Sequence, residues 1–302
     1  SIGNLAVGFD MLGLAIEGVG DRVSARKVSE KGVSVKEIYD LNGNPHTGLS
    51  KNSNENTASI AAQALWQTEN GQDGIEMLIY KGIPLQSGMG SSAASAVAGA
   101  VAVNALLDCP LPIAELMPYV LEGEKFASGS IHADNVAPSL IGGMVFCPRS
   151  YLPKITSIDV PKNISSVIVH PDLIVNTKKS RNGLANNYSM SQWLEQQSYL
   201  AGFLLGLQHN DLELIKNNMH DVIIEPQRAG SVVCFDDIKT SATEMGVLGC
   251  SLSGSGPSIF ALCENDIAPD VKAMMMDIFN SNNINSQGWI SPLNSSGAYV
   301  ES

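Results

Sequence analysis

Residues 84–94, PLQSGMGSSAA, place two glycines directly before a long alanine-rich run. The run from 91 to 107 predicts a buried helix, and the first amide N–H groups of a helix have no partner within it. Those groups and the helix dipole stabilise an anion if the backbone can approach it closely. Gly88 and Gly90 permit that approach because they carry no side chain. We therefore interpret the stretch as a phosphate cradle.

The same stretch has three other interpretations, which its remaining residues test. Ser91 or Ser92 can cap the helix, so a flexible loop with a capping serine is the plain alternative. No lysine follows the last glycine, which disfavours a Walker A loop. The letters GMGSSAA do not match the G-x-S-x-G nucleophile elbow, and the five histidines form no helpful pattern, so a serine hydrolase is disfavoured.

Composition excludes some classes of partner. The chain has 302 residues and a net charge of −12, which argues against nucleic acid but not against a small phosphorylated ligand. The opening residues do not resemble a signal peptide, and no apolar run is long enough for a confident membrane span. The five cysteines form no CxxC pair, and their odd number argues against a disulfide framework. We expect a cytoplasmic protein.

Hydrophobic patterning predicts alternating strands and helices, hence an α/β or α+β class. A second helix is expected at 113–126, with Pro118 as a possible kink. A stretch with two prolines and no clear period places a domain boundary near residue 160. The remaining expected strands lie at 74–80, 143–147, 166–170, 247–252 and 258–262, and the remaining expected helices at 191–207, 211–219, 236–245 and 271–280.

Three stretches in order resemble the motifs of one superfamily, which contains galactokinase, homoserine kinase, mevalonate kinase and phosphomevalonate kinase (GHMP). They are SIGNLAVGFD (1–10), PLQSGMGSSAA (84–94) and SLSGSGPSI (251–259). Within it, GFDMLG (8–13), SGSIHADNVAPSLIGG (128–143), VNTKKSR (175–181) and VIIEPQR (222–228) resemble the homoserine kinases. Members usually have a short β-strand before the first motif, whereas this sequence begins at the motif itself. Either that strand is missing or the numbering starts late; without the strand, the first motif would be tethered on one side only.

The resemblance implies a two-domain α+β kinase. Its N-terminal, ATP-binding domain (1–160) would be like ribosomal protein S5 domain 2, and its C-terminal domain (161–302) would be ferredoxin-like. The implied activity is ATP-dependent phosphorylation of the side-chain hydroxyl of L-homoserine, a step toward threonine. The partners implied are ATP, Mg²⁺, homoserine and a second copy of the chain, with no nucleic acid and no membrane.

The resemblance also assigns nucleotide and metal contacts. Ser92 and Glu124 would hold Mg²⁺, which proteins bind through one or two oxygens plus phosphates. Taken alone, Glu124 fits a solvated helix face and Lys81 a solvated strand end. The residues that match nucleotide-contacting positions are Asn56, Lys81, Pro84, Gly88, Gly90, Ser91, Ser92 and Ala93.

Homoserine is a zwitterion, so its two charges need two kinds of partner. Arg181 and Arg228 match the positions for its carboxylate, which the planar guanidinium fork suits. Asp10 and Asn4 match those for its amino group, although Asp10 alone could cap a helix starting at Met11. The remaining substrate-binding candidates are His132, Asn135, Thr177, Ser253 and Gly254; His132 could also be structural.

The catalytic base is left open between two neighbours. If Asn135 faces the hydroxyl, its amide cannot accept the proton, and the reaction relies on transition-state stabilisation with Arg181. If Asp134 faces it, general-base catalysis is available. We take the first as the working assignment. Two other functions remain as alternatives: a GHMP kinase for a mevalonate-like alcohol, and a non-catalytic nucleotide- or amino-acid-binding protein of the same fold.

Overall fold

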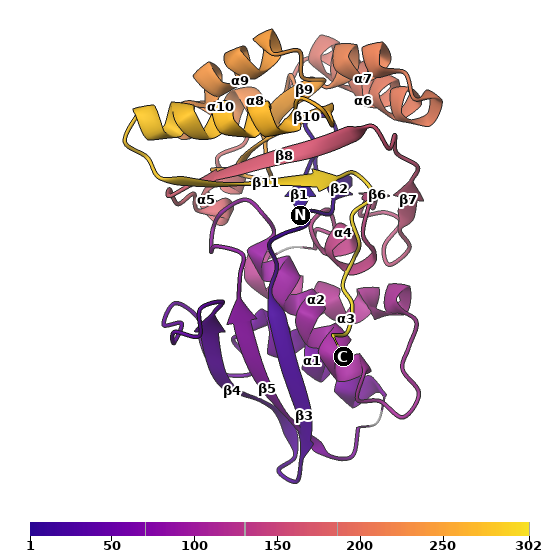
Figure 1. The fold of residues 1–302 in the computed structure, drawn as a ribbon. Helices are drawn as coiled ribbons and strands as arrows, with labels where there is room; N and C mark the ends of the chain where they lie inside the picture. Colours follow the sequence, from indigo (N-terminus) through magenta and orange to yellow (C-terminus); the bar gives the residue numbers. More distant parts are fainter. Residues whose placement is uncertain (70, 130, 186, 302) are drawn as a thin grey trace.

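The computed structural model describes residues 1–302 except residues 70, 130, 186 and 302. Its strands form three sheets, and Figure 1 shows them stacked from a lower to an upper part of the molecule. The mixture of separate sheets and helices confirms the α+β class. Within the described part of the chain, no helix is both long and apolar enough to cross a bilayer.

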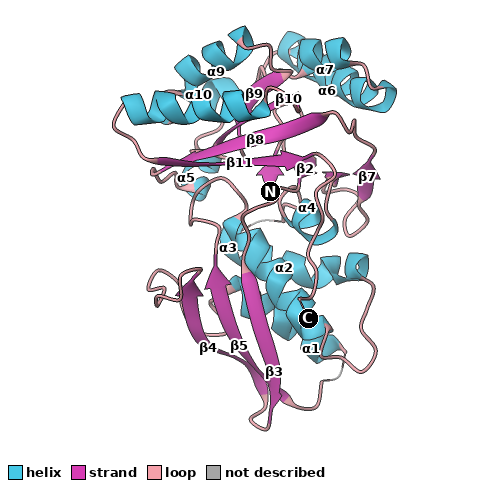
Figure 2. Cartoon of the chain, in the orientation of Figure 1, coloured by secondary structure: helices cyan, strands magenta, loops and turns pink. Residues whose placement is uncertain are grey.

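The lower part packs three helices against a three-stranded sheet (Figure 2). In that sheet β5 (Gly74–Lys81) lies between β3 (Arg22–Val28), which is antiparallel to it, and β4 (Gly32–Asp40), which is parallel. The apolar residues of β5 alternate with more exposed ones, so one face supplies the core. The covering helices are α1 (Thr57–Thr68), α2 (Ser91–Asn104) and α3 (Met117–Ser128).

The upper part contains an antiparallel sheet in the order β11-β8-β10-β9. Its central strand β8 (Ile164–Pro171) is buried along its whole length, because helices cover one face and the middle sheet lies toward the other (Figure 1). The other strands are β9 (Gly249–Leu252), β10 (Ile259–Glu264) and β11 (Ser286–Pro292). The helices are α5 (Thr177–Asn182), α6 (Met190–His209), α7 (Leu212–Asn218), α8 (Glu225–Arg228), α9 (Phe235–Glu244) and α10 (Ala268–Ser281).

A small sheet joins the two parts. It has the order β1-β2-β6-β7, and α4 (Val136–Ile141) packs beside it. Ile2 and Leu12 share one buried core with Ile168 and Phe260 of the upper sheet, so the start of the chain is packed against its second half. The strands are β1 (Ile2–Gly3), β2 (Leu12–Leu14), β6 (Met144–Phe146) and β7 (Thr156–Ile158).

The chain end also crosses between the parts. After β11 it returns to the lower half, where Ala298 N donates to Ser139 O at 3.0 Å. The domain boundary predicted near residue 160 stays a prediction, because one hydrophobic core contains residues from both sides of it and the chain end returns to the lower part. Strand β1 lies at a sheet edge, and its motif also contacts loop residues on its other side: Gly3 O accepts from Gly254 N at 3.2 Å.

Several local predictions were wrong in detail. The cap of α2 is Gly90 in the left-handed region (φ 70°), and neither Ser91 nor Ser92 caps the helix with its side chain. Pro118 lies in the first turn of α3, where its missing N–H costs nothing, so it does not kink the helix. No helix begins at Met11, because the chain enters β2 there.

Gly99→Ala tests the close approach of α1 and α2. A Cβ at Gly99 would lie 2.3 Å from Ala58 O, so the helices must separate. The cost of overpacking, about 1–3 kcal/mol, should exceed the gain in helix propensity of about 1 kcal/mol. We expect a lower urea midpoint for Gly99→Ala. Gly20→Ala is the control, because no atom lies within 4 Å of its Cβ position. An unchanged midpoint for Gly99→Ala would contradict this packing.

Candidate active site

Three loops meet where α2 begins. The structure thus brings together the three sequence motifs, which are far apart in the chain: loop 1 (1–10), loop 2 (84–94) and loop 3 (251–259). Ser253 Oγ of loop 3 donates to Gly88 O of loop 2 at 2.7 Å, and Asn4 Nδ2 of loop 1 donates to Gly254 O at 3.2 Å. Loop 2 therefore touches both of its neighbours, since Ser1 N also donates to Met89 O at 3.1 Å.

Two glycines of loop 2 make these contacts possible. Gly88 and Gly90 both adopt positive φ, of 76° and 70°. A Cβ at Gly88 would lie 2.4 Å from Ser253 O, and one at Gly90 would lie 2.7 Å from Asn135 Oδ1. Any side chain at either position would therefore separate the loops as well as strain the backbone.

The first turn of α2 presents free hydrogen-bond donors. Ala94 N donates to Gly90 O, but the amides of Gly90, Ser91, Ser92 and Ala93 find no acceptor anywhere in the described part of the chain. No side chain caps the helix. These amides, with the positive end of the helix dipole, form an arrangement that suits an anion.

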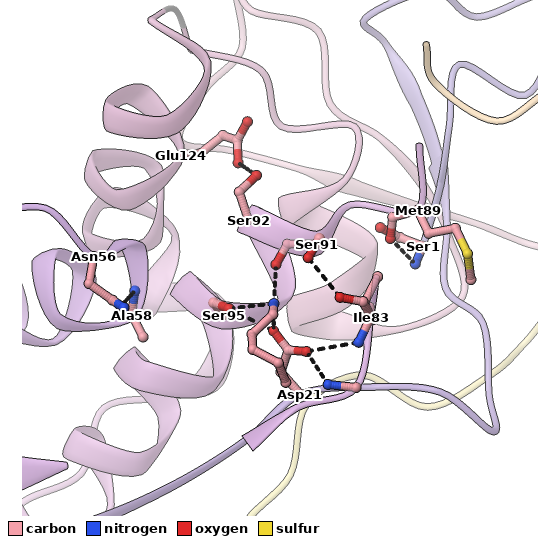
Figure 3. A network of polar contacts seen from close by, with 12 residues as sticks. Ser1, Asp21, Asn56, Ala58, Ile83, Met89, Ser91, Ser92, Ser95 and Glu124 are labelled. Atoms are coloured by element: carbon pink, nitrogen blue, oxygen red, sulfur yellow. Dashed lines mark hydrogen bonds and ion pairs between the residues drawn. The ribbon is translucent and has the colours of Figure 1, made fainter. Parts of the chain in front are cut away.

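Beside these amides, Ser92 Oγ donates to Glu124 Oε2 at 2.9 Å (Figure 3). Glu124 lies on α3 and is only 8% exposed, so the solvated-face interpretation was wrong. Burial, together with the charge of Asp134, raises the pKa of Glu124 to about 7, against the lowering effect of the Ser92 bond. A buried carboxylate and a hydroxyl on an anion-binding turn are hard oxygen donors that suit a small divalent cation.

Two expected nucleotide contacts are otherwise engaged. The Lys81 side chain is 3% exposed; its ammonium pairs with Asp21 and donates to Ser91 O and Ser95 Oγ. Its solvated-lysine alternative was wrong as well. Asn56 caps α1, accepting from Ala58 N at 3.1 Å and donating to Ser50 O. The three N–H groups of Lys81 are all used, whereas the second N–H of the Asn56 amide has no acceptor among the described residues. The Ser91 hydroxyl donates its hydrogen bond to Ile83 O at 2.9 Å.

Two predicted substrate residues bind each other. Arg181, on α5, donates from Nη1 and Nη2 to the two oxygens of Asp10, at 2.8 and 2.6 Å. His132 Nδ1 lies 3.3 Å from Asp10 Oδ2. Burial alone would raise the pKa of Asp10, but the hydrogen bonds and charges of Arg181 and His132 outweigh it and hold that pKa well below its usual value. Asp10 is therefore a fixed negative charge.

Arg228 also lies beside the Phe9 ring. Its Nη1 donates to Gly254 O at 2.9 Å, and it is only 5% exposed. The guanidinium groups of Arg181 and Arg228 lie 5.1 and 5.3 Å from the Phe9 ring centre, so this ring positions both. This bond links Arg228 to loop 3, while its buried Nε has no partner among the described residues, and its expected role at the substrate carboxylate stays a prediction.

The other substrate candidates from loop 1 and α5 are mainly supports. Asn4 Oδ1 accepts from Asp10 N at 3.2 Å, so both of its polar atoms are used within the loops. It was expected at the amino group. Thr177 Oγ1 is 3.2 Å from Ser255 Oγ, which links α5 to loop 3. Pro84 lies in loop 2, where the turn after β5 begins.

The two candidates for the proton have different environments. Asp134 is 4% exposed, and a Cβ at Gly3 would lie 2.6 Å from its Oδ2, so it packs behind loop 1. Burial and the charge of Asp10 raise the pKa of Asp134 to about 6, although His132 and Arg181 oppose the shift. Asn135 is half-buried between loops 1 and 2: its Oδ1 accepts from Ser1 Oγ at 3.0 Å and lies beside Gly90.

A cavity of about 260 Å³ opens beside this cluster. Of the predicted residues, Asp10, His132 and Arg181 line it, and Arg149 adds a charge that sequence reasoning missed. Phe9 stood within a recognised motif but was not singled out. Asp21 and Arg149 carry no sequence signal, because their roles depend on which strands become neighbours. Ser130, within the recognised 128–143 stretch, lies outside the described residues.

Family models match both halves of the chain. The one described as "GHMP kinases N terminal domain" matches residues 56–143, which include loop 2 and Glu124. The one described as "GHMP kinases C terminal" matches residues 203–278, which include loop 3. Together they cover more than half of the sequence.

Individual relatives are similar over nearly the whole chain. Homoserine kinase of Xanthomonas campestris is 38% identical, covering 99% of this chain and 91% of its own. Homoserine kinase of Chlorobium phaeobacteroides is 39% identical, covering 99% and 97%. The crystal structure of homoserine kinase from Cytophaga hutchinsonii superimposes with a TM-score of 0.92 at 41% identity, covering 98% of this chain and 93% of that one.

The pKa of Asp134 makes stability depend on pH. Because it rises from 3.8 to about 6, the folded protein holds this proton more tightly than the unfolded chain. The stability that results is complete below pH 3.8 and is lost as pH rises through about 6. Asp134→Asn has no carboxyl group to ionise, so the variant does not lose stability as the pH rises. Its free energy of unfolding should exceed that of wild type by about 1–3 kcal/mol at pH 8, and this difference should close near pH 4.

Urea unfolding of both proteins across pH 4–8 measures this gap. The control is Asp159→Asn, which changes an exposed carboxylate and should leave the pH profile unaltered. A constant difference between Asp134→Asn and wild type at every pH would contradict the assigned burial of this charge.

Proposed function

This chain belongs to the GHMP kinases, and from that premise we propose that it transfers the γ-phosphoryl group of ATP to the side-chain hydroxyl of L-homoserine. The observation that carries the proposal is the free first turn of α2, flanked by the Ser92–Glu124 pair and enclosed by three loops. The relatives named homoserine kinase, similar along the whole chain, support the choice of substrate.

In this proposal loop 2 binds the β- and γ-phosphates. The amides of residues 90–93 point their unused hydrogens at the phosphate oxygens, and Gly88 and Gly90 keep the backbone accessible. Phosphoryl transfer needs alignment and charge stabilisation more than covalent assistance, which rigid backbone donors supply. Asn56 and Lys81 act on the nucleotide indirectly, by holding α1 and the first turn of α2.

Ser92 and Glu124 are the residues that would hold Mg²⁺. Within the described residues no three acidic, His or Cys side chains gather into a metal site, which fits an ion that takes its other ligands from phosphates and water. When bound, the ion would neutralise phosphate charge. A triphosphate near Glu124 would otherwise meet a second anion, and this repulsion is a reason for the cation to bind between them.

The substrate would occupy the cavity beside Asp10. The carboxylate of Asp10 attracts the ammonium group, and His132 and Asn135 lie on the stretch between the cavity and loop 2. The homoserine oxygen forms a bond to the γ-phosphorus, the bond from that phosphorus to the ADP oxygen breaks, and the hydroxyl proton leaves to phosphate or water. Asp134 packs behind Gly3 and is absent from the cavity lining, which supports the assignment without a general base.

The Asp134→Asn variant also separates the two proton routes. A fall in turnover of only a few-fold supports loss of the proton to phosphate or water. A fall of roughly 10²–10⁴-fold supports Asp134 as the base.

The homodimer and the cytoplasmic setting expected from the sequence stay predictions; all five cysteines are free thiols.

An ADP-release assay over homoserine, mevalonate, shikimate and galactose tests the function. We expect turnover with homoserine well above the other three, because Asp10 provides a fixed negative charge for an ammonium group that they lack. Preference for mevalonate would establish the alternative kinase. ATP binding without turnover of any substrate would establish the non-catalytic alternative.

Glu124→Gln tests the metal assignment. The amide keeps the shape but removes the charge, so the Mg²⁺ concentration for half-maximal activity should rise on the order of 10–100-fold. Glu122→Gln, on the same helix but with a 55% exposed side chain, is the matched control and should leave it unchanged. Equal effects of both substitutions would argue against Glu124 as a ligand.

A further inference from the structure

Asp21 is a buried carboxylate near the first turn of α2, and it lies outside every motif identified in the sequence. Its side chain is 0% exposed. The residue comes directly before β3, whose register pairs Arg22 with Tyr80 and so places Asp21 opposite Lys81 at the end of β5. A carboxylate is costly to bury unless its oxygens are paired, so the partners of Asp21 indicate its role.

One oxygen of Asp21 binds the entry to loop 2. Asp21 Oδ1 accepts from Gly82 N at 2.9 Å and from Ile83 N at 3.1 Å, and Figure 3 shows the bond to Ile83. A glycine suits this contact, because a Cβ at Gly82 would lie 2.0 Å from Gly20 O. The segment that carries Asp21 therefore packs directly against the residues that lead into loop 2.

The other oxygen of Asp21 connects to the start of α2. Asp21 Oδ2 accepts from Ser95 Oγ at 2.6 Å and pairs with the ammonium group of Lys81. That ammonium group donates to Ser91 O at 3.0 Å and to Ser95 Oγ at 2.8 Å. The bond from Ser91 Oγ to Ile83 O closes a ring between the helix and the loop entry.

The bond to Ser91 O fixes the direction of a free donor. The carbonyl of Ser91 and the amide N–H of Ser92 belong to one planar peptide unit, so holding the oxygen also orients the hydrogen at the other end. The Ser92 amide is one of the four unused donors of residues 90–93. Misplacement of a reacting group by about 1 Å can cost on the order of 10²-fold in rate, so this orientation matters for phosphoryl transfer.

The pair supplies geometry to the site and no net charge. The charges of Lys81 and Asp21 cancel, so a phosphate at the turn gains no net positive charge from them. Burial lowers the pKa of Lys81, and the negative charge of Asp21 opposes that shift. Without Asp21 the ammonium form of Lys81 would lose this support, and its bonds to Ser91 O and Ser95 Oγ would weaken.

We propose that Asp21 is a positioning residue for the phosphate-binding turn, because it holds the entry to loop 2 directly and the start of α2 through Lys81. The proposal rests on the function proposed above and adds a residue that the resemblance did not assign. Asp21 does not line the cavity beside Asp10, so its effect should fall on the nucleotide and spare the amino-acid substrate.

The test measures the two substrates separately. Asp21→Asn keeps an oxygen for the two amides but removes the charge that holds Lys81. The KM for ATP, and the Kd for Mg–ATP from titration calorimetry, should rise about tenfold or more, the range for a weakened charged hydrogen bond. The KM for homoserine should stay within about twofold. Gly82→Ala displaces the same segment without changing a charge and should shift the same two quantities in the same direction.

Two controls separate position from surface charge and from stability. Glu76→Gln breaks the pair with Arg26, which joins the same two strands but is 66% exposed on the arginine side, and it should behave as wild type. Val271→Ala leaves a cavity in the core of the upper part, so it should lower the urea midpoint without changing either KM or the Kd for Mg–ATP. Circular dichroism establishes that each variant is folded.

The outcomes separate the two proposals. Folded Asp21→Asn that binds Mg–ATP as wild type does would overturn the role of Asp21, even if its urea midpoint fell as in Val271→Ala. An equal rise in the KM for ATP and for homoserine would also overturn it. If Asp21→Asn does not fold, Gly82→Ala decides by the same comparison. Wild type that binds Mg–ATP without phosphorylating homoserine would overturn the proposed function, whereas the Kd for Mg–ATP would still test Asp21.

Discussion

The whole site depends on the close approach of three loops at the start of α2. The approach requires the absence of side chains at two positions, since a Cβ at Gly88 or Gly90 would overlap atoms of loop 3 or of Asn135. Because the loops support one another, the helix can begin without a side-chain cap. The four donors that a cap or water would otherwise satisfy are thereby left for a ligand.

The buried ion pair of Lys81 and Asp21 fixes the first turn of α2. Lys81 links Asp21 to Ser91 O, while Asp21 accepts from the amides of Gly82 and Ile83. Such a pair adds little net stability, but breaking it by removing one partner costs about 3–5 kcal/mol. Its effect is therefore positional: strand β5, the entry to loop 2 and the first turn of α2 are held to one geometry.

Much of this could be predicted from the sequence, and the failures have physical causes. Helical and strand periods placed β5, β8, β9, β10 and most of the long helices, and α2 begins at the predicted Ser91, but β3, β4 and α1 of the lower part were not predicted. The motif resemblance identified loop 2 and the Ser92–Glu124 pair, which the structure brings together. The sequence could not predict which charged side chains pair with each other. Arg181 binds Asp10, and Lys81 binds Asp21, across separations of 171 and 60 positions in the chain.

The short stretch 132–135 connects the two halves of the chemistry. His132 lies against Asp10 at the cavity, Asp134 packs behind Gly3, and Asn135 touches loop 2 at Gly90. Four consecutive residues therefore span the distance from the amino-acid cavity to the phosphate-binding turn. Because the residue between His132 and Asp134 is buried too, the stretch cannot shift at one end without moving the other. Alignment of a substrate hydroxyl with the γ-phosphate then follows from the backbone itself, and the side chains need supply only charge and orientation.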